Sequence, residues 1–390
     1  MKQAVYFLCL AFVVTSYGSE LHWFKGNTHT HSLWSDGDDF PEMIADWYAE
    51  RGYDFLVLSD HNVLSRGERW YSVARATQKG AMDKYRQRFG DKVEEKDGKV
   101  RLKTYEEVRD MFKDRLLLVE GEEITDRFAD PNDGFKVRHV HINAMNNAEL
   151  IKPRGGKSVR DVMRNNLRAA IALEKETGQP ILTHLNHPNF HYSVTGEDLG
   201  HVVEEPFFEV FNGHPSINQL GNTNHVPVEV MWDQANAIRL REKQAAPLFG
   251  VATDDSHNYH GGKSSPGRGW VMVRAGKCSA EDLILAMRAG DFYASSGIQL
   301  REISYDADSR VLNIDIEPVD GATFTTEIIA LRGKEAPAEV VKEYSGLRVQ
   351  HSLDDRDLYV RAMIKSDQPH PNPTYKGQVQ QAWTQPVGWR

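Results

Sequence analysis

The sequence predicts an α/β protein, a closed or nearly closed barrel of strands and helices followed by a small antiparallel β domain. Short, unbroken apolar runs alternate with amphipathic stretches as far as about residue 300. Unbroken apolar runs are typical of strands that are buried on both faces of a parallel sheet. Beyond that point the helical period disappears, and short segments of alternating polarity replace it. The change of pattern predicts two parts of unequal size.

The first 18 residues are typical of a secretory signal peptide. Lys2 provides a positive start, residues 4–14 are apolar, and Ser16 and Gly18 supply small residues before a cleavage point after residue 18. A bilayer span requires about 20 apolar residues, so this run is too short to be one. We therefore expect an exported protein, periplasmic or extracellular, with no membrane partner; the alternative is a buried N-terminal helix.

The strands of the expected barrel are the apolar runs. They cover residues 23–24, 54–58, 116–119, 140–144, 180–183, 207–211 and 248–253. Helices are expected between them: Pro41 opens one that Gly52 closes, residues 157–177 form a long amphipathic stretch, and Ser279 caps another. Strand and helix alternate about seven times, which favours a barrel over residues 19–300.

Two segments do not follow this alternation. Residues 62–115 are strongly charged and long for a connection, and we interpret them as a helical insertion over one rim of the barrel. Residues 301–390 contain alternating segments separated by Gly, Pro and Asp, which predicts a β-rich C-terminal domain.

Composition and charge exclude some classes of partner. The chain has 390 residues, of which 40% are hydrophobic and 26% are charged, and its net charge is −9. An acidic chain is not expected to bind nucleic acid or an anionic membrane surface. A small-molecule substrate is expected instead, and bound cations would favour an anionic one. The sequence indicates no oligomeric state.

Metal-binding residue types recur at the ends of the apolar runs. His29 and His31 are two residues apart, so on a strand both imidazoles point to the same side, and Asp36 follows in a turn. The later runs lead to His61, Glu123, His141, His187, Asp255 and His257. A single histidine is more often structural, but repetition at strand ends favours a metal centre. Imidazoles mixed with carboxylates suit zinc, manganese or iron better than calcium or magnesium alone.

Further residues are candidates for supporting roles. His139 competes with His141 for the same ligand position. Asp60 is a candidate for orienting His61 or for capping the next helix, and His184 is a candidate for proton transfer. Arg268 could contact an anionic substrate through its planar fork of donors, although a surface arginine is an equally good interpretation.

Other catalytic classes have no support in the chain. No glycine-rich phosphate loop follows an expected strand, and no serine lies in a nucleophile-elbow sequence. The chain has two cysteines, Cys9 and Cys278, and Cys278 has no local partner for thiol catalysis.

As an ordered set, the motifs resemble those of the PHP superfamily of metal-dependent hydrolases, named after polymerase and histidinol phosphatase domains. The resemblance covers about residues 22–300 and rests on His29, His31, Asp36, Asp60–His61, Gly121–Glu123, His187–Pro188, Asp255 and His257. It implies a distorted (β/α)7 barrel with two or three divalent metal ions. Glu123 would bridge one ion, held also by His29, His31 and Asp255, to a second ion held by His141 and His187. Asp36, His61 and His257 would hold a third.

The resemblance also bears on function. The N-terminal segment, residues 293–297 and residues 382–386 are similar to a secreted branch of that superfamily, which includes carbaryl-hydrolase-like enzymes. We expect a secreted metal-dependent hydrolase, and we favour a phosphoesterase. It would use a metal-bridging hydroxide, with Glu123 as the central catalytic ligand. The alternatives are a carbamate, ester or amide hydrolase with the same metals, and a non-catalytic, metal-loaded binding protein.

Overall fold

The structure of the protein is a computed structural model that describes residues 20–389. The expected signal peptide, residues 1–18, lies outside the described residues. Among the residues that are described, no helix has the length and apolar character needed to cross a membrane.

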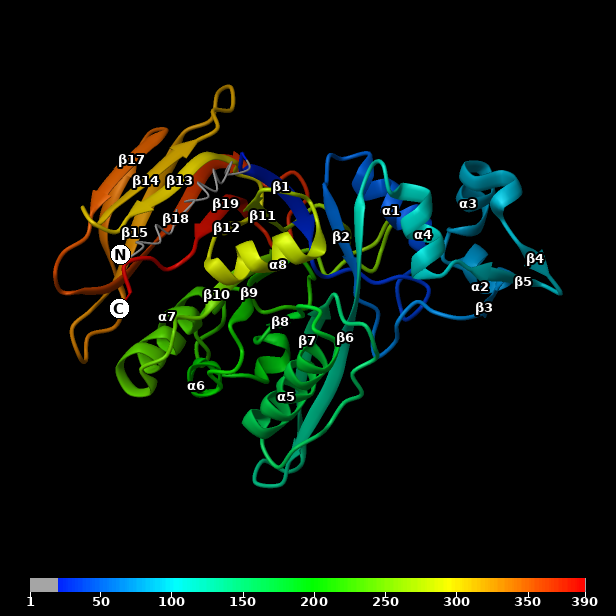
Figure 1. Cartoon of the computed structure of the whole chain (residues 1–390), viewed down its shortest axis with the longest axis horizontal. Coiled ribbons are helices and arrows are strands. Elements are labelled where there is room, and N and C mark those ends of the chain that lie inside the picture. Colours follow the sequence, from blue (N-terminus) through cyan, green and yellow to red (C-terminus); the bar gives the residue numbers. More distant parts are fainter. Residues whose placement is uncertain (1–19, 390) are drawn as a thin grey trace, which may run out of the picture.

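Strands and helices form a mixed α/β fold whose largest sheet has 13 strands (Figure 1). The strands expected from the apolar runs form one half of that sheet, in the order β10-β9-β8-β7-β6-β2-β1. Parallel pairing joins β1 with β2, β2 with β6, β8 with β9, and β9 with β10. The bounds are β1 His22–Asn27, β2 Phe55–Leu58, β6 Leu117–Asp130, β7 Lys136–Met145, β8 Leu182–Leu185, β9 Phe207–Asn212 and β10 Phe249–Thr253.

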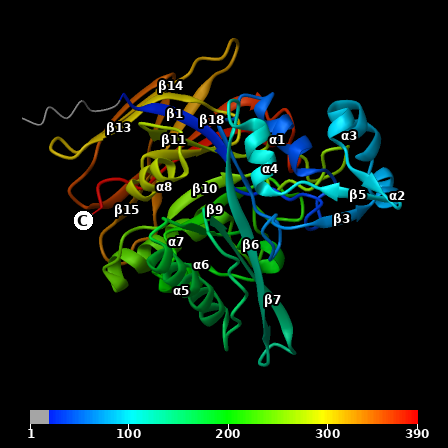
Figure 2. The same cartoon turned by 45° about the vertical axis from the view of Figure 1, so that its right-hand side comes forward.

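One strand departs from the parallel arrangement that the alternation predicts. β7 is antiparallel to both β6 and β8, because β6 and β7 form a long hairpin with no helix between them. The hairpin projects from the rest of the molecule (Figures 1 and 2). Its register pairs Glu123 with Asn143 and Thr125 with His141, so the returning strand carries His141 back towards Glu123.

The two ends of this strand series meet at the carboxyl ends of their strands. Thr30 and Ser256 form a parallel bridge, and the His31 N–H donates to the Ser256 carbonyl over 3.0 Å. The Asp255 N–H donates to the His29 carbonyl, also over 3.0 Å. The segments that follow β1 and β10 therefore lie side by side and carry polar side chains to a common point.

The local sequence predicts where these helices begin, although the first of them ends at Ala49 and not at Gly52. α1 (Pro41–Ala49) has proline in its first turn. α5 (Val159–Thr177) begins at the Ser158 cap and ends at Gly178, whose φ of 70° is left-handed. α8 (Ala280–Ala289) is capped by Ser279 and ends at Gly290 in the same way. The remaining helices of this part are α6 (Gly196–His201), α7 (Val228–Ile238), the short η2 (Phe190–Tyr192) and the π-helix η3 (Arg239–Lys243).

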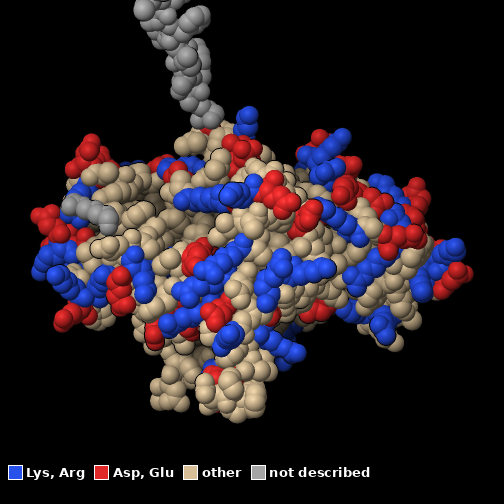
Figure 3. All heavy atoms as spheres, turned by 60° about the horizontal axis from the view of Figure 1, so that its bottom comes forward, with Lys and Arg blue, Asp and Glu red and all other residues tan. Residues whose placement is uncertain are grey.

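Charges near α5 are compensated locally. Arg160 pairs with Glu197 and Asp198, and Arg288 pairs with Glu174. Figure 3 shows acidic and basic side chains interspersed over one face of the molecule. Exposed pairs of this kind contribute little individually to stability.

Residues 62–115 contain strands as well as the expected helices. The helices are α2 (Val73–Gln78), α3 (Met82–Phe89), α4 (Tyr105–Phe112) and the short η1 (Gly90–Lys92). β3 (Arg69–Ser72), β4 (Glu95–Lys96) and β5 (Lys99–Leu102) form a separate sheet in the order β3-β5-β4. The segment packs on the rest of the chain through Tyr85, whose ring stacks on Phe40 with centroids 3.8 Å apart. This unit lies at one end of the molecule (Figure 1).

Some of the C-terminal strands extend the large sheet, and the others form a second, smaller sheet. From β1 the sheet continues through β11 (Trp270–Ala275), β12 (Phe292–Ser295), β19 (Val379–Thr384), β18 (Asp357–Pro369), β15 (Phe324–Arg332) and β16 (Glu339–Ser345). A second, three-stranded sheet contains β13 (Leu300–Asp306), β14 (Val311–Ile316) and β17 (Arg348–Ser352). Ile314 and Ile328 belong to the same buried cluster as Leu56 and Leu58, so one core extends through both parts.

Candidate metal centre

The candidate centre begins at the segment that follows β1. His29 and His31 are fully buried, and their Nε2 atoms lie 3.0 Å apart, so both imidazoles point to the same place. Period-two geometry of extended backbone explains this, because side chains two residues apart share a face.

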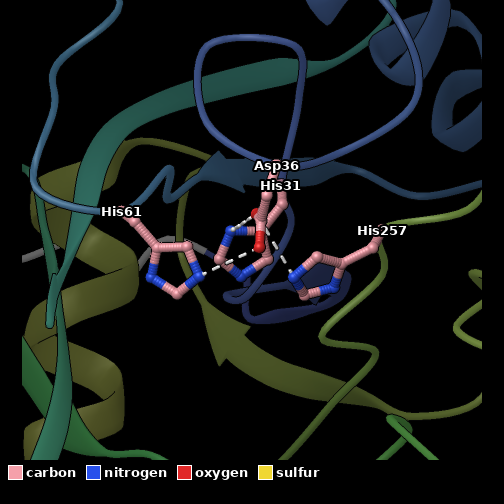
Figure 4. A group of neighbouring side chains, drawn as sticks. All are labelled: His31, Asp36, His61 and His257. Carbon is pink, nitrogen blue, oxygen red and sulfur yellow. Dashed lines mark ion pairs between the residues drawn. The ribbon is translucent and has the colours of Figure 1, made fainter.

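Three groups of side chains bring potential ligand atoms within 4.8 Å of one another. They are a first group of His29, His31 and Asp255, a second of His61, Glu123 and His141, and a third of His31, Asp36, His61 and His257. His31 and His61 each belong to two groups, so the three form one continuous cluster. Figure 4 shows the third group, in which Asp36 lies between the imidazoles.

Glu123 lies at the centre of the cluster and is 1% exposed. Its Oε1 is 2.9 Å from His141 Nδ1 and 3.4 Å from His187 Nε2. Its Oε2 is 2.7 Å from His61 Nδ1 and 3.5 Å from His31 Nε2. Oε1 is also 3.6 Å from His29 Nε2, so the two carboxylate oxygens face different sets of imidazoles.

The two aspartates of the cluster occupy opposite environments. Asp255 is buried, and its Oδ1 is 3.4 Å from His29 and 3.3 Å from His31. Asp36 has a side chain that is 54% exposed; its Oδ1 is 3.4 Å from His257 and its Oδ2 is 3.5 Å from His61. The side of the cluster at Asp36 is therefore its open side.

The protonation states suit metal ligands in part. Burial opposes the charge of Glu123, but His61, His141 and His29 outweigh burial and hold its pKa well below the usual range. Burial, reinforced by His257, lowers the pKa of His31 to about 3, and burial also lowers the pKa of His141. At neutral pH the carboxylate is ionised and these two imidazoles are neutral, as metal coordination requires.

Buried atoms without partners test whether a cation fits. Among the described residues, His31 Nδ1 and His141 Nε2 are buried and have no hydrogen-bond partner. Buried polar atoms are normally paired, and an orphaned one is costly. The Nδ1 of neutral His141 donates to the Glu123 carboxylate, so its Nε2 carries a lone pair that a divalent cation satisfies without a further donor. The donor set therefore fits a metal centre.

Three non-glycine residues with left-handed backbone lie in or beside the cluster. His187 and Asp255 have φ values of 27° and 47°, and Asn62, next to His61, has a φ of 49°. Non-glycine residues rarely adopt left-handed conformations, and such strain is commonly held at functional sites. The surrounding structure fixes these ligands in conformations that the chain alone disfavours.

The structure also locates the remaining candidates. His141 lies beside Glu123, whereas the ring of His139 is 5.8 Å from that of His141 and packs against Phe190 and His191. His184 is buried with its ring centroid 6.3 Å from that of His29, and burial lowers its pKa to about 4. Neither imidazole belongs to the three ligand groups.

Asp60 does not contact the imidazole of His61. It accepts hydrogen bonds from the Ser32 N–H and Oγ, at 2.8 and 2.6 Å, and from Ser35 Oγ at 2.5 Å. It therefore shapes the turn between His31 and Asp36.

Arg268 is 6% exposed and its donors are largely occupied within the chain. Its Nη1 donates to the carbonyls of Gly213 and Lys263, and its Nε lies 3.3 Å from Asn372 Oδ1. The guanidinium connects the loop after β9, the loop after β10 and the C-terminal part of the chain.

Polar residues that the sequence reasoning missed surround the ligands. Glu209 lies 2.7 Å from His29 Nδ1, and Asn212 Nδ2 donates to Asp255 Oδ2 over 3.0 Å. Asn186 donates to Glu123 Oε1 over 2.9 Å, and His214 packs its ring 5.3 Å from that of His257. A signal for Glu209 exists, since it is an acid inside the otherwise apolar run 207–211. The asparagines and His214 carry no comparable signal.

Comparison with known proteins adds a structural likeness. No family model matches the chain, and no curated protein matches it in sequence. A solved two-domain protein from Bacteroides vulgatus ATCC 8482, containing a predicted PHP-like metal-dependent phosphoesterase, is 15% identical with a TM-score of 0.36, covering 94% of this chain and 95% of that one. A proposed metal-dependent phosphoesterase from Bifidobacterium adolescentis ATCC 15703 is 14% identical with a TM-score of 0.31, covering 62% of this chain and 89% of that one.

At these TM-scores the likeness carries no conclusion about the family or activity of this chain. The fold and the side chains define the class by themselves: a mixed α/β protein with a candidate centre for divalent metal ions.

Proposed function

We propose that this protein is a metal-dependent hydrolase that acts on phosphate esters. The observation that carries the proposal is the position of Glu123, whose Oε1 faces His141 and His187 while its Oε2 faces His61 and His31. A carboxylate has two oxygens and can join two cation sites, whereas a single imidazole nitrogen serves one.

The three ligand groups would hold two or three divalent ions, zinc, manganese or iron, with Glu123 shared between neighbouring ions. His187, 3.4 Å from Glu123 Oε1, would complete the second group. Imidazole and carboxylate donors together suit these ions better than calcium or magnesium. Bound ions of this kind lower the pKa of a water molecule towards neutrality and neutralise the charge of phosphate oxygens.

The chain itself fixes the ligand atoms and excludes bulk water. His29, His31 and Glu123 have almost no exposed surface, so they keep one arrangement and are little screened by solvent. Asp36 is the ligand with a largely exposed side chain, and a substrate would therefore approach on its side of the centre.

The preference for phosphate follows from the sharing of ligands. His31 and His61 each belong to two groups, so cations bound there would be neighbours. A phosphate ester presents several anionic oxygens that can contact neighbouring cations, whereas a carbamate or carboxylic ester presents one carbonyl oxygen. A phosphate ester can therefore contact more of the bound cations at once than a carbamate or carboxylic ester can.

The test is a substrate panel on metal-free protein and on protein reloaded with zinc, manganese or iron. The panel contains p-nitrophenyl phosphate, bis-p-nitrophenyl phosphate, p-nitrophenyl acetate and an aryl carbamate. We expect phosphate ester hydrolysis that disappears with the metal and returns on reloading. Full activity of the metal-free protein would contradict the proposal, as would hydrolysis of the carbamate or acetate without that of either phosphate ester.

A further inference from the structure

Glu209 is a buried acid in the middle of an apolar strand. Every residue of β9 (Phe207–Asn212) is buried, and Glu209 itself is 1% exposed. Burying a carboxylate costs several kcal/mol unless hydrogen bonds or opposite charges compensate it. An acid at this position therefore requires dedicated partners.

Four donors converge on this carboxylate. Oε1 lies 2.7 Å from His29 Nδ1 and accepts from Thr253 Oγ1 at 2.7 Å. Oε2 accepts from the His187 N–H and from Asn212 Nδ2, each at 2.7 Å. An ionised carboxylate is an acceptor only and offers about four lone-pair directions, so the four donors use it completely.

These contacts reach ligands on three different segments. The Nδ1 of His29 donates to the Glu209 carboxylate, so when the ring is neutral its Nε2 keeps a lone pair towards His31 and Asp255. The His187 N–H is held while that residue has a left-handed φ of 27°. Asn212 donates its other N–H to Asp255 Oδ2, which leaves Oδ1 towards the imidazoles.

We propose that Glu209 is the positioning residue of the metal centre, the single carboxylate that fixes the tautomer of His29 and the orientation of His187 and Asp255. The inference rests on the proposed metal centre, and it goes beyond it by assigning a role to a residue that is not itself a ligand. Partners of this kind orient metal ligands and raise their basicity.

Glu122 provides a matched control. It is also fully buried, but it lies on the opposite face of β6 and accepts hydrogen bonds at Oε1 alone, from Asn147 Nδ2 and the Ile151 N–H. An amide can reproduce that pattern with its oxygen. An amide at position 209 cannot, because either orientation turns an NH2 group towards two donors.

The experiment compares E209Q with E122Q. Metal-free proteins are titrated with zinc in competition with a chelator, and circular dichroism verifies folding. We expect E209Q to lose about 10- to 100-fold in zinc affinity and E122Q to stay within about 3-fold of the wild type. Equal affinities in folded E209Q and wild type would overturn the inference, as would an equal loss in E122Q.

A second measurement is made on the unsubstituted protein, so it does not depend on the folding of E209Q. Nitrogen-15 NMR of the imidazoles reports the tautomer of His29, with the signal assigned by its absence in H29Q. We expect an Nδ1-protonated ring and a strongly hydrogen-bonded, low-field Nδ1 proton in zinc-loaded protein. An Nε2-protonated His29 would overturn the inference.

The two hypotheses fail differently. If the wild type binds no divalent ion, the proposed function fails and Glu209 has nothing to position. If the wild type binds zinc but E209Q binds it equally well, the positioning role fails and the metal centre stands.

Discussion

At the residue scale, the consecutive glutamates of β6 have opposite environments. Glu123 lies among the imidazoles, whereas Glu122 is held by Asn147 and Ile151. Burial raises the pKa of Glu122 to about 8, so at neutral pH it is already uncharged. Alternation along a strand separates two identical side chains into a candidate ligand and a neutral structural group.

The first prediction compares E123Q with E122Q. Glutamine at position 123 removes a negative charge. It also replaces one of the two carboxylate oxygens that face the imidazoles with an NH2 group, which cannot bind a cation. We expect turnover to fall by about 1,000-fold or more and the metal content to drop, while E122Q retains activity within a small factor. Metal analysis and kinetics on both variants measure this.

The reverse result would be informative. If E122Q abolished turnover while E123Q spared it, the assignment of ligand and structural glutamate would be wrong. If both variants were fully active, Glu123 would have no part in the reaction.

The second prediction concerns protons released on metal binding. Burial lowers the pKa of His61, but Glu123 and Asp36 reverse this and raise it to about 11. The pKa of His257 is raised as well, since Asp36 and Asp255 outweigh burial. In metal-free protein these rings are therefore charged at neutral pH, and a metal ion must displace their protons.

The sign follows from linkage. Charged His61 stabilises metal-free protein below its unfolded pKa of about 6.5, and that stabilisation is lost as the pH rises through about 11. Metal affinity should therefore increase with pH between about 6 and 8, with net proton release. Calorimetric titration in two buffers of different ionisation enthalpy measures the number of protons released on metal binding. A number of zero or below would contradict the prediction.

Sequence reasoning succeeded for residues whose spacing carries the signal and failed for residues defined by tertiary contacts. His29 and His31 follow from the period of a strand, and the structure brings them together. Glu209 and Asn212 acquire their partners only when β9 lies beside β8 and β10. Asp60 was a candidate for orienting His61 or for capping the next helix, but its partners are Ser32 and Ser35, 28 and 25 residues earlier in the chain.

At the element scale, the loop between β10 and β11 carries Asp255 and His257 and is stabilised by hydrogen bonds between its own residues. Asp254 is buried and accepts the N–H groups of Gly267, Arg268 and Gly269. Arg268 then connects the loop to Gly213 and Asn372. A side chain with these contacts supports the loop, and little of it is left to meet a substrate.

The third prediction follows for R268M. Methionine has comparable length but no donors, so the carbonyls of Gly213 and Lys263 lose their partner. We expect a loss of about 3 kcal/mol in stability and a lower metal affinity, with KM of the remaining active protein nearly unchanged. Urea unfolding and kinetics separate these effects. A raised KM with unchanged stability would instead indicate the substrate contact that the sequence suggested.

Elements were predictable to different degrees. The extent of α5 and the Ser279 cap of α8 are local features and were predicted from the sequence, whereas the Ser158 cap of α5 was not. The antiparallel direction of β7 was not predicted, because an apolar run does not reveal whether a hairpin or a helix precedes it. β4 has two residues, too few for any alternation to appear.

At the scale of the whole molecule, the N-terminal and C-terminal parts share one sheet and one core. β19 pairs with β12, and the ring of Trp383 stacks on Phe211 with centroids 5.8 Å apart. Phe211 precedes Asn212, which holds Asp255. The described elements from Leu300 onward are all strands, but polarity patterns do not show which strands pair across such a change.

The last prediction tests this unity through a buried ion pair between α7 and β18. Asp233 accepts from the Arg361 guanidinium at 2.8 and 2.7 Å and from the Tyr359 hydroxyl at 2.6 Å, and Arg361 is 2% exposed. D233A leaves a buried charge without this partner, which typically costs about 3–5 kcal/mol. R356A removes the exposed pair with Asp354 and should cost about 1 kcal/mol or less.

Because one core extends through both parts, we expect D233A to show a single urea transition in which tryptophan fluorescence and metal release coincide at a lower midpoint. Two separate transitions, with metal release at the wild-type midpoint, would show that the C-terminal strands unfold independently of the centre.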